Sequence, residues 1–216
     1  MLFRSPDGAG DTWTWTALDA ESKLIIQWFV GARDADCAKL FINDLSTRVI
    51  GRLQLTSDGL KSYLQAVEDA FGADVDYAQL VKLYGASPDS AKGRYSPAEC
   101  TGIKKNIIEG QPDEKHISTS YNERHNLTMR MQMRRFTRLT NGFSKKLESH
   151  ICAISLYFVF YNFCRIHKTL KVTPAMAAGI TDKLMSFEDI VAMIDAVAPK
   201  PGRPATYKKR GDENSN

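Results

Sequence analysis

The chain has 216 residues, 43% of them hydrophobic and 25% charged, which is typical of a soluble globular protein. Its four cysteines are scattered and form no Cys-x-x-Cys pair, which argues against a zinc site or a disulfide framework. The N-terminus has no apolar core of signal-peptide length, and the most apolar stretch, residues 151–163, is too short to span a bilayer. We therefore expect a cytoplasmic protein with no membrane partner.

The first 85 residues alternate strand and helix patterns, which is typical of an α/β fold. Thr and Trp alternate in residues 12–18 and predict a strand, which forms a hairpin with a second strand at 23–31. Helical spacing or β-favouring residues then predict helix 34–50, strand 52–57, helix 60–71 and strand 79–84.

The rest of the chain is mainly helical in its pattern. Residues 85–101 are rich in Gly, Ser and Pro and predict a loop, and a strand is expected at 103–109. Three helices follow, at 119–139, 145–166 and 187–197. Residues 1–10 read as a loop, and the tail, 198–216, is expected to be disordered because it is rich in proline and charge.

Charge is distributed unevenly between the two halves. Residues 1–117 carry 13 Lys and Arg against 17 Asp and Glu, a net charge of −4, whereas residues 118–216 carry 16 against 8, a net charge of +8. This asymmetry suggests that the second half binds a polyanion, with nucleic acid as the first candidate. The alternative is a basic surface that is solvated and has no partner.

Asp58 is the first candidate site residue. It follows a short apolar strand and precedes Gly59, and loops at the carboxyl ends of strands are where α/β proteins place reactive groups. The alternative is a turn or helix-capping aspartate, because Asp-Gly is a common turn dipeptide.

Glu123 is the second candidate, at the start of the basic helix predicted at 119–139. Ser120-x-x-Glu123 matches the capping box, so one interpretation is that Glu123 only caps this helix. At about 100° per residue, however, the exposed face of Glu123 also carries polar and basic side chains, opposite a core stripe of Met129, Met133 and Phe136. These polar and basic residues are Asn126, Arg130, Arg134 and, slightly further round, Arg138.

A carboxylate beside a row of arginines indicates chemistry on a phosphodiester backbone. Two acidic groups from different elements can share Mg²⁺, which prefers carboxylate oxygens, and two such ions can promote in-line displacement at phosphorus. Arginines beside them would hold phosphates and would make binding dependent on salt. By contrast, His125, the aromatic run at 157–163 and the two tryptophans Trp13 and Trp15 are interpreted as structural and mostly buried.

Taken together, these motifs resemble the DDE-type transposases of bacterial insertion sequences, most closely the insertion-sequence-one family. The resemblance rests on the motif Thr56-Ser57-Asp58-Gly59 after a strand and on Glu123-Arg124-His125-Asn126-Leu127 at the start of a basic helix. Arg130 stands seven positions after Glu123, where these families commonly have a basic residue, and residues 129–146 look like their post-glutamate helix. The segment from Tyr161-Asn162 to Thr173-Pro174 is similar to the end of integrase-like cores.

The resemblance covers about residues 11–180 and implies a ribonuclease H-like mixed sheet flanked by helices, followed by a C-terminal helix at 181–197. It also implies a metal-binding Asp-Asp-Glu triad that takes Mg²⁺ or Mn²⁺, with Asp58 second and Glu123 third. The DNA-binding residues carried over are Asn126, Arg130, Arg134, Arg138, Lys145 and Lys146. The first acid lies, in the family, on a central strand that precedes the segment corresponding to residues 12–18. We therefore expect the chain to be truncated at its N-terminus and to lack that strand and its acid; Asp19 reads as a turn residue, and Asp11 precedes the tryptophan strand.

The implied activity is cleavage and strand transfer at the ends of an insertion sequence, impaired here by the absent acid. The implied partners are donor-end and target DNA, together with a second copy of the chain, because transposition joins two ends. One alternative is a non-catalytic DNA-binding fragment that competes with an intact transposase. Another is a ribonuclease H-like nuclease that does not join strands.

Overall fold

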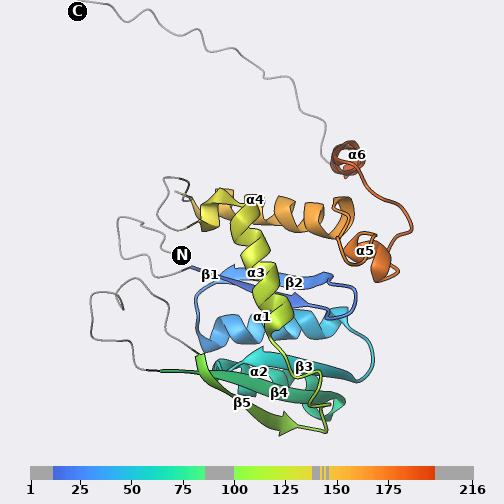
Figure 1. Cartoon of the computed structure of the whole chain (residues 1–216). Helices are drawn as coiled ribbons and strands as arrows, with labels where there is room; N and C mark the ends of the chain where they lie inside the picture. Colours follow the sequence, from blue (N-terminus) through green and yellow to red (C-terminus); the bar gives the residue numbers. More distant parts are fainter. Residues whose placement is uncertain (1–11, 86–99, 138–141, 143, 145, 198–216) are drawn as a thin grey trace, which may run out of the picture.

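The computed structural model describes residues 12–85, 100–137, 142, 144 and 146–197. These residues form two small sheets with helices packed on both faces (Figure 1). The prediction of an α/β fold that contains a mixed sheet flanked by helices is confirmed. The predictions made for residues 1–10, 198–216 and most of 85–101 lie outside the described residues.

The first sheet is the predicted hairpin. β1 (Trp13–Leu18) and β2 (Ile25–Gly31) are antiparallel and run from the pair Trp13–Gly31 to the pair Leu18–Ile25. Asp19 stabilises the turn, as expected, because its carboxylate accepts a hydrogen bond of 2.9 Å from the backbone N of Ser22. Trp15 is buried, but the expectation of burial is wrong for Trp13, which is 40% exposed at the open end of the strand.

The second sheet has the order β3-β4-β5. β3 (Leu53–Asp58) is parallel to β4 (Val75–Tyr84), and β5 (Cys100–Glu109) is antiparallel to β4, so the sheet is mixed. β4 and β5 start earlier than the sequence pattern predicts. Two helices connect the strands, α1 (Ala35–Arg48) from β2 to β3 and α2 (Ser62–Phe71) from β3 to β4.

One hydrophobic core joins the two sheets. α1 begins after Asp34, whose side chain accepts a 2.8 Å hydrogen bond from the backbone N of Cys37, and it buries one face at helical spacing. The buried core side chains come from β1, α1, α2 and β4, and we call this group the Trp15 cluster. Its members are Trp15, Ala38, Phe41, Ile42, Leu45, Ala66, Val67, Val75 and Tyr77.

The opposite face of the sheets is covered by the second half of the chain. α3 (Ser120–Gln132) crosses the hairpin and leads to α4 (Leu147–Val159), which continues as a π-helix, Phe160–Cys164 (Figure 1). The short α5 (Pro174–Ala177) and the terminal α6 (Phe187–Val197) follow. The core between these helices and the hairpin is the Tyr157 cluster, made of Ile25, Met129, Ile154, Tyr157, Phe158 and Tyr161.

α3 is shorter than the predicted helix 119–139. It ends at Gln132, Met133 has an extended backbone, and the residues Arg134–Phe136 form a separate 3-10 turn. Packing explains this end, because the turn brings the ring of Phe136 to 5.4 Å from the ring of His150 at the start of α4. The predicted core stripe of Met129, Met133 and Phe136 is confirmed, although its last two members do not lie on the helix.

The described residues contain one segment with the length and composition of a membrane span, Leu147–Cys164. It comprises α4 and its π-helical extension. Ile154, Tyr157 and Phe158 from this segment are buried against β2 and α3, as the sequence pattern for a core helix predicts. These side chains thus pack as those of a core helix do.

Candidate functional site

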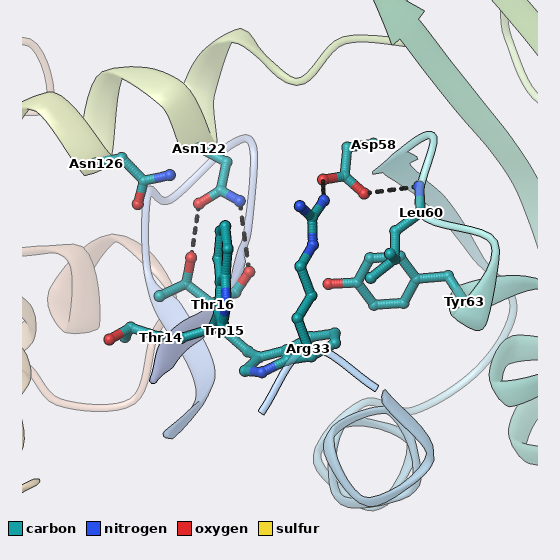
Figure 2. Close-up of a pocket in the computed structure, with 10 residues that line it drawn as sticks. Thr14, Trp15, Thr16, Arg33, Asp58, Leu60, Tyr63, Asn122 and Asn126 are labelled. Atoms are coloured by element: carbon teal, nitrogen blue, oxygen red, sulfur yellow. Dashed lines mark hydrogen bonds and ion pairs between the residues drawn. The ribbon is translucent and has the colours of Figure 1, made fainter. Parts of the chain in front are cut away.

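A pocket of about 180 Å³ opens between the first strand of the hairpin and the end of β3. Figure 2 shows it with α3 on one side, which carries Asn122 and Asn126, and with the ion pair of Asp58 and Arg33 on the other. Its walls come from β1, the β2–α1 connection, β3, α2 and α3. The lining residues are Trp13, Thr14, Trp15, Thr16, Arg33, Asp58, Leu60, Tyr63, Asn122 and Asn126.

Asp58 lies at the carboxyl end of β3, as predicted from the sequence. One carboxylate oxygen accepts a 3.1 Å hydrogen bond from the backbone N of Leu60, so the predicted turn role is also present. The other oxygen lies 3.6 Å from Nη2 of Arg33. The Arg33 guanidinium in turn lies over the ring of Trp13, 4.7 Å from its centroid. Asp58 therefore faces the pocket with a cation beside it.

Glu123 lies in the first turn of α3, and its carboxylate is held from two sides. Lys82 Nζ on β4 is 2.6 Å from Oε2, and the Thr119 hydroxyl donates a 2.8 Å hydrogen bond to Oε1. Partial burial opposes ionisation, but the hydrogen bonds from Lys82 and Thr119 and the lysine charge outweigh it and lower the pKa of Glu123. The capping-box interpretation is wrong, because Glu123 binds the side chain of Thr119 rather than the backbone N–H that precedes the helix.

Asn122 and Asn126 are one helical turn apart on α3 and both reach the pocket (Figure 2). The Thr16 hydroxyl donates a 2.8 Å hydrogen bond to Oδ1 of Asn122, and Nδ2 of Asn122 lies 3.5 Å from the backbone O of Thr16. These contacts attach α3 to β1, as Lys82 attaches it to β4. Asn126, a predicted DNA-binding residue, lies in the pocket wall on the same side as Asn122.

The predicted row of basic residues along one helix face is only partly formed. Arg130 is exposed on α3, but Arg134 lies on the 3-10 turn beyond the end of the helix, so the two do not share a helical face. Lys146 is exposed immediately before α4. The remaining two predicted DNA-binding residues, Arg138 and Lys145, lie outside the described residues.

The fit of the site to divalent metal ions is incomplete. Asp58 and Glu123 come from different elements, and each already has a basic partner, Arg33 and Lys82. Across the part of the chain that the structure describes, no group of three or more His, Cys, Asp and Glu side chains could hold a metal ion. The described side chains alone therefore do not form a site for two metal ions, which needs several shared carboxylates.

The side chains that hold Glu123 and Asn122 in place could not be predicted from the sequence. Lys82 and Glu123 are 41 residues apart, and Thr16 and Asn122 are 106 apart, so no local pattern joins them. The one local signal was Lys82, a charged residue near the end of the mostly buried strand β4, where a buried or half-buried lysine needs a partner.

No protein-family model, curated protein or solved structure matches this chain.

Proposed function

We propose that this chain is the core of a DDE-type insertion-sequence transposase with a ribonuclease H-like fold, and that it acts on DNA in the cytoplasm. The observation that supports this most directly is that Lys82 ties Glu123 to the strand beside Asp58. Asp58 is paired with Leu80, and Lys82 lies two residues further along β4, a step of about 7 Å. Asp58 therefore lies at the carboxyl end of β3, and Lys82 holds Glu123 near the carboxyl end of the neighbouring β4. Carboxyl ends of strands are where α/β proteins place reactive groups.

The incomplete set of carboxylates defines what this chain does by itself. A DDE-type site needs a third acid beside Asp58 and Glu123, and Asp58 is the one acidic residue among those that line the pocket. We therefore propose that the chain binds DNA but does not cleave it, in Mg²⁺ or in Mn²⁺, unless the missing carboxylate is supplied. In this structure Arg33 forms an ion pair with Asp58, and Lys82 forms one with Glu123.

DNA binding is assigned to the exposed basic residues at the end of α3 and the start of α4. Arg130, Arg134 and Lys146 are exposed, and each can contact a phosphate. Loss of phosphate contacts weakens binding to all sequences alike and flattens the dependence of affinity on salt. Arg130→Ala/Arg134→Ala should therefore weaken binding to a random-sequence duplex and reduce the slope of log K against log salt by about two.

A matched control is Arg48→Ala, which removes an exposed arginine at the end of α1, on the other side of the sheets. Binding would be measured by fluorescence anisotropy at several salt concentrations, and cleavage by gel analysis in Mg²⁺ and Mn²⁺. Equal losses in the Arg48 variant and the double variant would contradict this assignment of the DNA-binding surface. Cleavage by the unmodified chain that survives Glu123→Gln would exclude a role for Glu123 in the reaction.

The incomplete site also favours a second candidate function, that of an inhibitor of an intact transposase of the same type. A chain that binds DNA without cleaving it occupies DNA ends unproductively. Adding the chain to an end-cleavage reaction of an intact enzyme should then lower the yield, and Glu123→Gln should inhibit equally. No inhibition at saturating chain would reject this candidate.

A further inference from the structure

Buried polar atoms without a hydrogen-bond partner gather where α3 packs against α4. Both ring nitrogens of His125 on α3, the Tyr157 hydroxyl on α4 and Nη1 of Arg165 are buried, and none has a partner among the described residues. The ring of His125 lies 6.1 Å from that of Tyr157 and 4.7 Å from that of Tyr161. Native proteins leave few buried polar atoms unpaired, and a bound ion or water often accounts for those that remain.

The π-helical end of α4 brings Arg165 to these rings. Tyr157, Tyr161 and Arg165 recur every four residues, so they follow one side of the helix and its extension. Such π-helical turns are rare and often occur at functional sites. Burial and the charge of Arg165 lower the pKa of His125, and the same charge opposes the rise that burial gives the pKa of Tyr157 and Tyr161. We call these four residues the Arg165 group.

The positive charge of the Arg165 group is not balanced by an acid. Across the described part of the chain, half-buried Arg165 forms no ion pair with Asp or Glu. Burial and the charges of Arg165 and Lys23 lower the pKa of His167, so a second cation lies nearby. Lys23 also acts on Asp19, whose carboxylate accepts a hydrogen bond from the backbone N of Ser22. Because partly buried charges are normally paired, Arg165 calls for an anion.

An oxyanion suits the unpaired atoms better than a single-atom ion. Arg165 Nη1 and the Tyr157 hydroxyl are donors, and a neutral His125 donates from one ring nitrogen and accepts at the other. These groups come from two helices, so several acceptor atoms on one ligand can each meet a different donor. Phosphate has four oxygens for this purpose, and arginine is the side chain best suited to bind it.

We propose that the Arg165 group is a phosphate-binding site, in which Arg165 supplies the charge and Tyr157 and His125 supply hydrogen bonds. The ligand is a phosphate group, either free or in a polynucleotide backbone. It enters past Arg165, the half-exposed member of the group. The site lies at the opposite end of α4 from Lys146, and thus away from the surface assigned to DNA. It requires only phosphate chemistry and does not rest on the proposed function.

The test titrates the full chain with inorganic phosphate at constant ionic strength, adjusted with potassium chloride. Isothermal titration calorimetry should show one phosphate bound per chain, and NMR shifts of the Arg165 Nε–H and the Tyr157 ring should change together. Arg165→Gln should weaken binding at least about tenfold, because it removes a charge-assisted hydrogen bond. Tyr157→Phe keeps the aromatic ring and should weaken binding about threefold or more, so the test does not depend on one variant.

The matched control is Arg124→Gln, which removes an exposed arginine from α3 and should leave phosphate affinity unchanged. Arg130→Ala/Arg134→Ala should also bind inorganic phosphate as the unmodified chain does, even where it binds DNA more weakly. Failure of the DNA-binding surface and failure of the phosphate site are therefore distinguishable. No phosphate binding, or equal affinity in the unmodified chain and the Arg165 and Tyr157 variants, would overturn the proposal.

A DNA duplex separates the two sources of the phosphate. If the site holds a backbone phosphate, saturating duplex should lower the affinity for inorganic phosphate and should shift the Arg165 and Tyr157 signals by itself. If the site takes free phosphate, the duplex should change neither. Each result supports the site, provided that Arg165→Gln abolishes the effect of inorganic phosphate, and each identifies a different ligand.

Discussion

The two hydrophobic clusters differ in whether their buried polar side-chain atoms are hydrogen-bonded. In the Trp15 cluster, the Tyr77 hydroxyl is hydrogen-bonded to Ser57 at 2.7 Å and to Gln79 at 2.9 Å. Around the Tyr157 cluster, both ring nitrogens of His125 and the hydroxyl of Tyr157 are buried and have no hydrogen-bond partner among the described residues. The first cluster therefore supplies stability to the fold, whereas the second, beneath α3, carries polar groups at a cost to stability.

The largest effect is expected from the Trp15 cluster, because it joins the two sheets. Phe41 on α1 is buried, with its ring 5.8 Å from that of Trp15. Phe41→Ala should lower the free energy of unfolding by about 3–5 kcal/mol, measured by chemical denaturation. Leu40→Ala is the matched control, since Leu40 is 59% exposed on the same helix. Similar losses in the two variants would contradict the assignment of the core.

The Tyr157 cluster should make stability depend on pH. Burial, assisted by the charge of Arg165, lowers the pKa of His125 to about 4, below its ordinary value of 6.5. Between these values the unfolded chain binds a proton that the folded chain does not, so stability falls as pH decreases from 6.5 to 4. The loss should be on the order of 3 kcal/mol at the lower end.

Replacing the histidine tests this pH dependence. His125→Phe should flatten the profile of unfolding free energy against pH across that window, measured by denaturant titration at several pH values. The matched control is Met129→Leu, a change in the same cluster that should alter stability equally at every pH. An unchanged profile in the phenylalanine variant would mean that another group carries the pH dependence.

A smaller pair of effects should have opposite signs in the two clusters. Tyr77→Phe removes the hydroxyl that is hydrogen-bonded to Ser57 and Gln79 and should destabilise the fold by about 1 kcal/mol. Tyr157→Phe removes a buried hydroxyl that has no hydrogen-bond partner in the described chain and should stabilise the fold by about 1 kcal/mol. Thermal denaturation of the two variants in parallel measures this, and changes of the same sign would remove the distinction between the clusters.

The smallest effect is expected at the surface. Lys82 and Glu123 form an exposed ion pair, so Lys82→Ala should change the free energy of unfolding by less than about 1 kcal/mol. Its expected consequence is local, namely a higher pKa of Glu123, because the hydrogen bond and charge of Lys82 lower it. NMR titration of the Glu123 carboxyl carbon in both proteins checks this, with Lys39→Ala as a control for a distant surface ion pair.

Local patterns predicted most of the elements and failed where distant contacts decide the structure. The apolar spacing of α1 and the Thr-Trp alternation of β1 can each be recognised within the element's own residues. Both elements form close to the predicted bounds. The end of α3 could not be predicted, because Met129, Met133 and Phe136 continue a helical pattern while packing on His150 stops the helix. Contact with a distant element overrides local propensity there.

The candidate site was predictable to a similar degree. Asp58 could be placed from its own neighbours, since a strand pattern ends at an Asp-Gly dipeptide. For Glu123, the sequence indicated the start of a helix but not the side chains that hold its carboxylate, because Lys82 lies on another strand. The transposase function and the metal site remain predictions.

β5 has a consequence for handling the protein in solution. It is the outer strand of its sheet, and it exposes Ile103 and Ile107, each more than half accessible to solvent. Lys104 and Lys105 lie between them, and charged side chains on an edge strand oppose pairing between molecules. Salt screens that repulsion, so concentrated samples should remain dispersed at low ionic strength and associate through β5 as salt is raised. Buffers that weaken binding to DNA would thus favour aggregation.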